Sequence, residues 1–287
     1  MTDILKSIEE KKIQWSSQEP HKSIKLFGCS HLAALYKAVD DKHGSNFTHQ
    51  IFEQNTGVIG GNSNHKIIED VYRYVNGYQM EPKFCGINSD ALLYSNPPLD
   101  DLTNSIVYIQ CTYTNRLWLP TTLNSYTSSF HSLATNSGLL YMNNKIFQEE
   151  LIRFYGLYIK FFWNHYLNLL DLLQKIDMLQ IYLKSKNIKF IQTFWSFGGH
   201  TPEWRELSEA VISKERDLSD IKKQIDDILK RIEYVKPDGY DTIDEYLLNH
   251  TSTLQENQKY VDGVHWKSKY YEKVFNEIIY PKYLELS

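Results

Sequence analysis

The sequence lacks the short motifs that point most directly to a nucleotide site. It contains neither a Gly-x-x-x-x-Gly-Lys-Ser/Thr loop nor a Gly-x-Gly-x-x-Gly turn, the glycine-rich patterns that cradle phosphate groups. Its formal net charge of -4 leaves no excess of basic residues for contacts with a nucleic-acid backbone. These absences argue against a nucleic-acid-binding protein. They also lower the case for a transferase that acts on a nucleotide or sugar donor.

Cysteine is scarce as well. The three cysteines, Cys29, Cys85 and Cys111, form neither an even set for disulfides nor the spacing of a metal site. Cys29 and Cys111 end apolar, strand-like runs, so we expect buried free thiols at both positions. We predict no metal ion and no organic cofactor.

A hydrophobic run long enough to span a membrane is also missing. Residues 154–173 come nearest, but polar groups interrupt them at Lys160, Asn164, His165, Asn168 and Asp171. We expect a largely buried helix there. Residues 1–19 are polar and do not resemble a secretory signal, so the cytoplasm is the default expectation, with association with a virus particle left open.

What is present is typical of a globular protein. The 287 residues suffice for a domain with a large core, and 42% of them are hydrophobic and 23% charged. Tyrosine is unusually frequent, with 21 residues against 13 Phe and 6 Trp. Two interpretations of this stay open: a large α/β core, or a contact surface for sugar or protein.

Alternating strand and helix patterns predict the fold. We expect strands at 24–27, within 51–59, at 105–111 and at 188–195, and helices at 31–39, 65–75 and 146–186, the last with a break near Gly156 or Asn164. Residues 105–111 are apolar apart from Gln110, as in parallel strands covered on both faces. The sequence therefore predicts a doubly wound α/β domain with a parallel sheet.

The domain has two expected additions. Residues 1–22 read as an N-terminal extension to an α/β domain over 23–287, and residues 201–258 as a helical insertion in it. A helix over 203–234 is predicted from a narrow stripe of Leu, Val and Ile, with Thr201 as its N-cap and an end before Pro237. This helix either packs back on the domain or acts as a lid or an oligomerisation arm.

Ser30, Asp262 and His265 are the candidate catalytic residues. Ser30 follows the first strand and a glycine, where ligands gather in parallel α/β sheets and where the N-terminus of a helix favours a developing negative charge. A serine hydroxyl needs an imidazole to remove its proton, and the imidazole needs an oriented acceptor. The spacing Asp262-x-x-His265 supplies both groups just before the last predicted helix.

These motifs resemble those of the SGNH (GDSL-type) hydrolases. Gly28-Cys29-Ser30 is similar to the Gly-Asp-Ser block of that family, Gly61 matches the glycine after its second strand, and Asp262-Gly263-Val264-His265 matches its Asp-x-x-His block, followed by a terminal helix over 267–283. The resemblance implies a three-layer α/β/α, flavodoxin-like fold and an esterase, lipase or carbohydrate deacetylase activity. It implies that the N–H of Gly61 helps to bind the oxyanion.

Two positions depart from the family pattern. Cys29 replaces the aspartate before the serine; we expect its side chain to point into the core, which disfavours it as the nucleophile. In the third block the glycine is missing, Thr114 stands at the position of the oxyanion-binding asparagine, and Asn115 is one residue late. Losing one oxyanion donor costs roughly 100- to 1000-fold in turnover.

Arg116 either binds an anionic group or a sugar hydroxyl, or pairs with a surface carboxylate.

Other residues fall near the same strand ends. His31 and His200 are expected in helix packing or at the solvent, with lining of the cleft as the alternative. Trp195, Trp204 and Trp266 are either aromatic platforms for a sugar or buried core residues.

The sequence thus favours an esterase that acts on an acyl group, with acetyl on a carbohydrate as the expected substrate class. Ser30 would be the nucleophile, His265 the base, Asp262 its orienting partner, and Gly61 with Thr114 or Asn115 the oxyanion site. The competing prediction is a binding or structural protein that keeps this scaffold without turnover. We predict a small-molecule or carbohydrate ester as partner, no nucleic acid and no membrane span.

Overall fold

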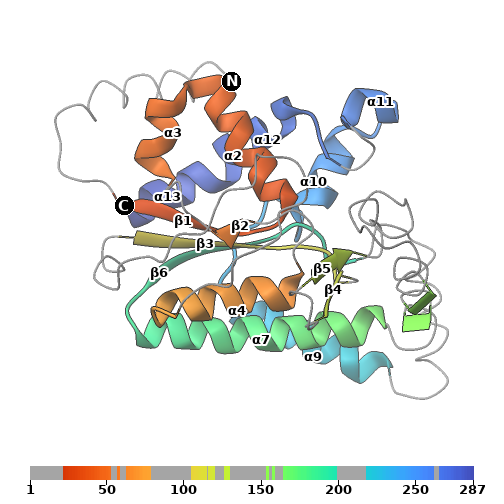
Figure 1. The fold of residues 1–287 in the computed structure, drawn as a ribbon. Coiled ribbons are helices and arrows are strands. Elements are labelled where there is room, and N and C mark those ends of the chain that lie inside the picture. Colours follow the sequence, from red (N-terminus) through yellow and green to blue (C-terminus); the bar gives the residue numbers. More distant parts are fainter. Residues whose placement is uncertain are drawn as a thin grey trace.

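A four-stranded parallel sheet forms the centre of the protein (Figure 1). The computed structural model describes residues 22–52, 57–58, 63–78, 105–114, 116–119, 126–129, 153–154, 157–158, 164–198, 218–261 and 265–287. The sheet has the order β2-β1-β3-β6, formed by β1 (Ser23–Gly28), β2 (Gly57–Val58), β3 (Ser105–Cys111) and β6 (Lys189–Phe194). An antiparallel pair, β4 (Arg116–Leu119) and β5 (Tyr126–Ser129), stands apart from it.

Helices cover both faces of this sheet (Figure 1). One face carries α2 (Ser30–His43), α3 (Ser45–Ile51), α10 (Ile243–His250), α12 (Ser268–Val274), the π-helical turn η2 (Phe275–Ile279) and α13 (Tyr280–Leu286). The other face carries α4 (Asn64–Val75), α7 (His165–Ser185) and α9 (Leu218–Arg231). A short helix, α11 (Glu256–Lys259), precedes the C-terminal helices.

The strand sequences account for this layering because successive side chains of a strand point to opposite faces. In β3, Ile106 and Tyr108 enter the hydrophobic cluster on the α2 side, whereas Val107 and Ile109 enter the cluster on the α7 side. Every residue of β3 is buried, as a strand in the middle of a parallel sheet requires.

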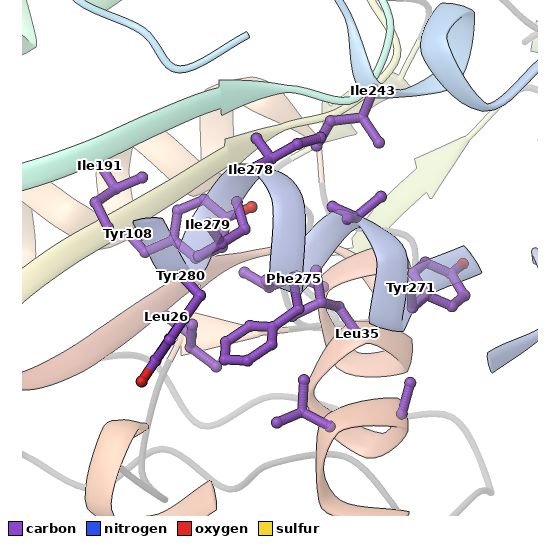
Figure 2. Packing of buried hydrophobic residues seen from close by; sticks show 14 of the residues in the cluster. Leu26, Leu35, Tyr108, Ile191, Ile243, Tyr271, Phe275, Ile278, Ile279 and Tyr280 are labelled. Carbon is purple, nitrogen blue, oxygen red and sulfur yellow. The ribbon is translucent and has the colours of Figure 1, made fainter. Parts of the chain in front are cut away.

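The C-terminal helices close the first cluster. Figure 2 shows the ring of Phe275 directed toward Leu26 and Leu35, and Ile278 and Ile279 on the turn that faces Tyr108 and Ile191 of the sheet. The turn η2 ends two residues before Pro281, which has no N–H to donate to the helical ladder. The predicted terminal helix over 267–283 is therefore present, but it contains one wider turn and continues to Leu286.

The mixed α/β fold with a parallel sheet is confirmed, and three of the predicted strands lie within a residue or so of β1, β3 and β6. The prediction of a strand within 51–59 is also confirmed, because Gly57–Val58 form β2 and pair with β1. Residues 45–51 form α3, a helix that was not predicted. The helical signal there is the buried pair Phe47 and Ile51, four residues apart. The β4–β5 pair was not predicted.

The long helix begins at the predicted break. Asn164 is the N-cap of α7, and its side chain accepts a hydrogen bond from the backbone N–H of Leu167 at 3.0 Å. Among the residues that the structure describes, no helix is both long and apolar enough to cross a membrane.

The segment predicted as an insertion, 201–258, is described from Leu218 onward and contributes to both faces. Three isoleucines of α9, Ile221, Ile225 and Ile228, are buried in the cluster with α7, while Ile243 of α10 is buried in the cluster with α2. Between these helices the chain runs beside the edge of the sheet, where the N–H of Val235 donates to the carbonyl of Gln192 at 2.8 Å. The described part of the predicted helix 203–234 thus packs on the domain and ends at Arg231, earlier than expected. A lid or arm remains a prediction for 203–217, which lie outside the described residues, as do residues 1–21.

A buried ion pair joins two turns of α4 and gives a test of this layer. Nζ of Lys66 lies 2.7 Å from Oδ1 of Asp70, and the two side chains are 1% and 0% exposed. We expect Asp70→Asn to lower the free energy of unfolding by about 3 kcal/mol, because it leaves the buried ammonium without its main counter-charge. Urea denaturation measures this change.

The matched control is an exposed pair with the same spacing on α7, Asp171 and Lys175, whose N···O distance is 2.6 Å. Asp171→Asn should cost less than about 1 kcal/mol. The double substitution Lys66→Met/Asp70→Leu should recover most of the loss. Equal costs for Asp70→Asn and Asp171→Asn would contradict this account.

Candidate functional site

Ser30 is the first residue of α2 and follows directly on β1, at the carboxyl end of the sheet. The close approach of β1 to α2 at this turn requires a glycine at residue 28. A Cβ at Gly28 would lie only 2.8 Å from Cδ2 of Leu32. Cys29 is fully buried with a free thiol, as expected, whereas Ser30 is partly exposed. The serine thus stands at the positive end of a helix and within reach of solvent.

His265 lies beside the start of α2, although 235 positions separate it from Ser30. Its carbonyl accepts a hydrogen bond from the N–H of Val261 at 2.8 Å, and the following residue, Trp266, forms an antiparallel bridge with Tyr260. This narrow loop brings the ring of His265 to 5.2 Å, between centroids, from the ring of His31. The structure therefore places His265, the predicted base, beside His31, which follows the predicted nucleophile Ser30 in the sequence.

The other candidate residues are described in part. Thr114 follows β3 at the same edge, is 7% exposed, and its hydroxyl donates to the carbonyl of Phe197 at 3.5 Å. Arg116 begins β4 and pairs with Ser129. Gly61, Asn115 and Asp262 lie outside the described residues, so their roles stay predictions; His200 and Trp204 also lie outside.

Asn64 is a residue of this edge that sequence reasoning missed. Its carboxamide accepts from the N–H of Thr112 at 2.6 Å and donates to the carbonyls of Thr112 and Tyr113 at 3.0 and 3.3 Å. The start of α4 is thereby tied to the turn after β3. Ser63, the N-cap of α4, accepts from the N–H of Lys66. The pair Ser63-Asn64 before a helical pattern is a recognisable capping signal, but nothing local indicates its partner across the sheet.

His31 is a second residue of this edge whose position the sequence left open. It is fully buried, and its ring stacks on that of Trp195 at 3.9 Å with an interplanar angle of 10°. Nδ1 lies 3.0 Å from the hydroxyl of Tyr271, and Nε2 lies 3.5 Å from the hydroxyl of Tyr113. The expectation of helix packing is thus correct and that of solvent exposure is wrong. The available signal was the spacing of His31 from Leu35, which puts both on the apolar face of α2.

The tryptophans of this edge belong to the core. Trp195 and Trp266 are 0% and 2% exposed, so the interpretation as buried residues is correct for both. The indole N–H of Trp266 donates to Oδ1 of Asp244 at 3.2 Å, and the N–H of Asp244 donates to the carbonyl of Trp195 at 2.9 Å. These bonds attach the loop of His265 to the end of β6.

Asp244 carries the clearest electrostatic perturbation near the site. Burial raises its pKa to about 6, the nearby charge of Glu245 adds to the rise, and the hydrogen bond from Trp266 acts in the opposite direction. No group of three or more His, Cys, Asp or Glu among the described residues could hold a metal ion.

Comparison with models of protein families, with curated proteins and with solved structures finds no match for this chain. The resemblance to the SGNH hydrolases consequently rests on the sequence motifs.

The raised pKa of Asp244 gives a prediction with a defined sign. The folded state binds the proton of this carboxyl more tightly than the unfolded state, so its contribution to stability falls as pH rises from about 4 to about 6. We expect Asp244→Asn, which keeps an acceptor for Trp266, to raise the free energy of unfolding at pH 8 by about 1 to 2 kcal/mol. The gain should nearly vanish at pH 4.

Urea denaturation of both proteins at the two pH values measures the effect. Asp238→Asn, at an exposed turn, is the control and should change the free energy of unfolding by less than about 0.5 kcal/mol at either pH. A loss of stability at pH 8 on Asp244→Asn would show that the carboxylate is not penalised by burial.

Proposed function

We propose that the protein is a serine esterase of the SGNH type. The observation that supports the proposal is the position of His265, whose ring lies 5.2 Å from the ring of His31, the residue that follows Ser30. Such a hydrolase needs a nucleophile and a base at the carboxyl edge of a parallel sheet, and the two may come from opposite ends of the chain.

The architecture supports the same proposal. In flavodoxin-like sheets the strands have the order 2-1-3-4-5, and the four parallel strands described here, numbered along the chain, have the order 2-1-3-4. Helices on both faces agree with a three-layer α/β/α arrangement. Fold alone does not imply function, so the residues at the sheet edge carry the argument.

The proposed reaction proceeds in two steps. Oγ of Ser30 attacks the ester carbonyl while His265 takes the hydroxyl proton; the C–O bond to the alcohol then breaks, and the alcohol leaves with that proton. Water, deprotonated by His265, attacks the acyl-serine and releases the carboxylic acid and Ser30. Asp262 would orient His265 throughout. The family resemblance favours an acetyl group on a carbohydrate as the substrate class.

The oxyanion would be held by backbone N–H groups of Ser30 and Gly61 and by a third donor, Thr114 or Asn115. Ser30 supports this role because its N–H lies in the first turn of α2, where the helix dipole favours negative charge. Thr114 is at the same edge, but its hydroxyl donates to Phe197. Turnover should therefore be slower than in an esterase with an asparagine at this position.

Substitution of Ser30 and His265 tests the proposal. We expect Ser30→Ala to abolish labelling by a fluorophosphonate probe, and either Ser30→Ala or His265→Ala to lower kcat for p-nitrophenyl acetate by at least about 1,000-fold. The assays are gel fluorescence after labelling and release of p-nitrophenol.

Two matched controls belong to this experiment. Ser196→Ala removes another partly exposed serine from the carboxyl edge, after β6, and His49→Ala removes an exposed histidine from α3. Both should keep labelling and turnover. Labelling that survives Ser30→Ala, or turnover that is indifferent to both Ser30→Ala and His265→Ala, would rule the esterase out.

A second candidate function is a binding scaffold without turnover. The hydrogen bond from the hydroxyl of Thr114 to Phe197 favours it, because this hydroxyl is then directed away from an oxyanion. In that case the wild type would not react with the fluorophosphonate, yet acetylated oligosaccharides would raise its melting temperature, and the rise would grow with the logarithm of their concentration above Kd.

A further inference from the structure

We infer that His31 is a positioning residue that holds the imidazole of His265 in place at the start of α2. The inference rests on the proposed function, because it assigns His265 as the base. It concerns a histidine that the proposed mechanism does not use and whose ring lies 5.2 Å from that of His265.

The ring of His31 is fixed on three sides. Trp195 covers one face at 3.9 Å, the hydroxyl of Tyr271 lies 3.0 Å from Nδ1, and the hydroxyl of Tyr113 lies 3.5 Å from Nε2. All four side chains are at most 2% exposed. Since a close-packed interior leaves no space for a ring to swing, this imidazole has one position.

The hydrogen bonds also assign its tautomer. The indole N–H of Trp195 donates to the hydroxyl of Tyr113 at 2.9 Å, so the proton of that hydroxyl is directed elsewhere, and Nε2 of His31 is the acceptor beside it. Nδ1 then carries the hydrogen and donates to the hydroxyl of Tyr271. His31 thus has hydrogen-bond partners at both ring nitrogens.

The loop that carries His265 is also fixed. The bridge between Tyr260 and Trp266 fixes its backbone, and Trp266 is tied through Asp244 to the carbonyl of Trp195, the same residue on which His31 stacks. The two imidazoles meet at 5.2 Å with an interplanar angle of 50°. A base held by a rigid wall keeps its geometry between turnovers, and displacing it by about 1 Å can cost about 100-fold in rate.

Tyr271→Phe tests the inference, with Tyr270→Phe as its matched control. Both remove a buried hydroxyl from adjacent residues of α12. The hydroxyl of Tyr271 contacts His31, whereas that of Tyr270 makes no hydrogen bond with the described residues. We expect Tyr271→Phe to lower kcat for p-nitrophenyl acetate by about 10- to 100-fold with KM within about twofold, and Tyr270→Phe to change neither. Equal kcat values in the two variants would overturn the inference.

A spectroscopic measurement separates this inference from the proposed function. Long-range ¹⁵N–¹H correlation spectra, assigned with His31→Gln and His265→Gln, should show His31 with its hydrogen on Nδ1, and Tyr271→Phe should shift the ring signals of both histidines. Tyr270→Phe should leave them in place. If the wild type has no esterase activity, the proposed function fails, and these spectra still decide the inference. His265 signals that are identical in the wild type and Tyr271→Phe would overturn it.

Discussion

The contacts of one buried imidazole organise the carboxyl end of the sheet. His31 lies three residues after the end of β1, and its ring stacks on Trp195 at the end of β6. The two ring nitrogens face the hydroxyls of Tyr113, after β3, and Tyr271, on α12. A polar ring in this place is stable only because its nitrogens have partners, since an unsatisfied buried polar group costs about 1 to 3 kcal/mol. The positions of β1, β3, β6 and the C-terminal helix therefore depend on one another through the contacts of His31.

Further bonds extend the same network across the edge. Asn64 ties the start of α4 to the turn after β3, and Thr114 and Asp244 tie their segments to the chain after β6. Side chains that are fixed by such a network lose little further entropy when a ligand binds, so the site is preorganised. The position of His265 follows from this network rather than from its own sequence neighbourhood.

Sequence patterns predicted what is decided locally. The apolar run 105–111, the break in the long helix at Asn164 and the buried thiol of Cys29 each depend on a few neighbours in the chain, and each lies where expected. The helix α3 was missed because a helix of a few residues carries little periodicity. The partners of His31 lie 82 to 240 positions away, and no local pattern contains such a contact.

Under the proposed function, the hydroxyl of Thr114 would be an oxyanion donor only if it leaves its present acceptor. Its hydroxyl donates to a neutral carbonyl at 3.5 Å, which is at the long limit for such a bond, so little energy holds the proton in that direction. An oxyanion is a charged acceptor and forms a shorter hydrogen bond that is about twice as strong. The developing charge of the transition state would therefore draw the hydroxyl away from Phe197, whereas a ground-state ester carbonyl would not. Such a donor acts selectively on the transition state, and the departure from the family pattern at this residue is compatible with slow turnover rather than with none.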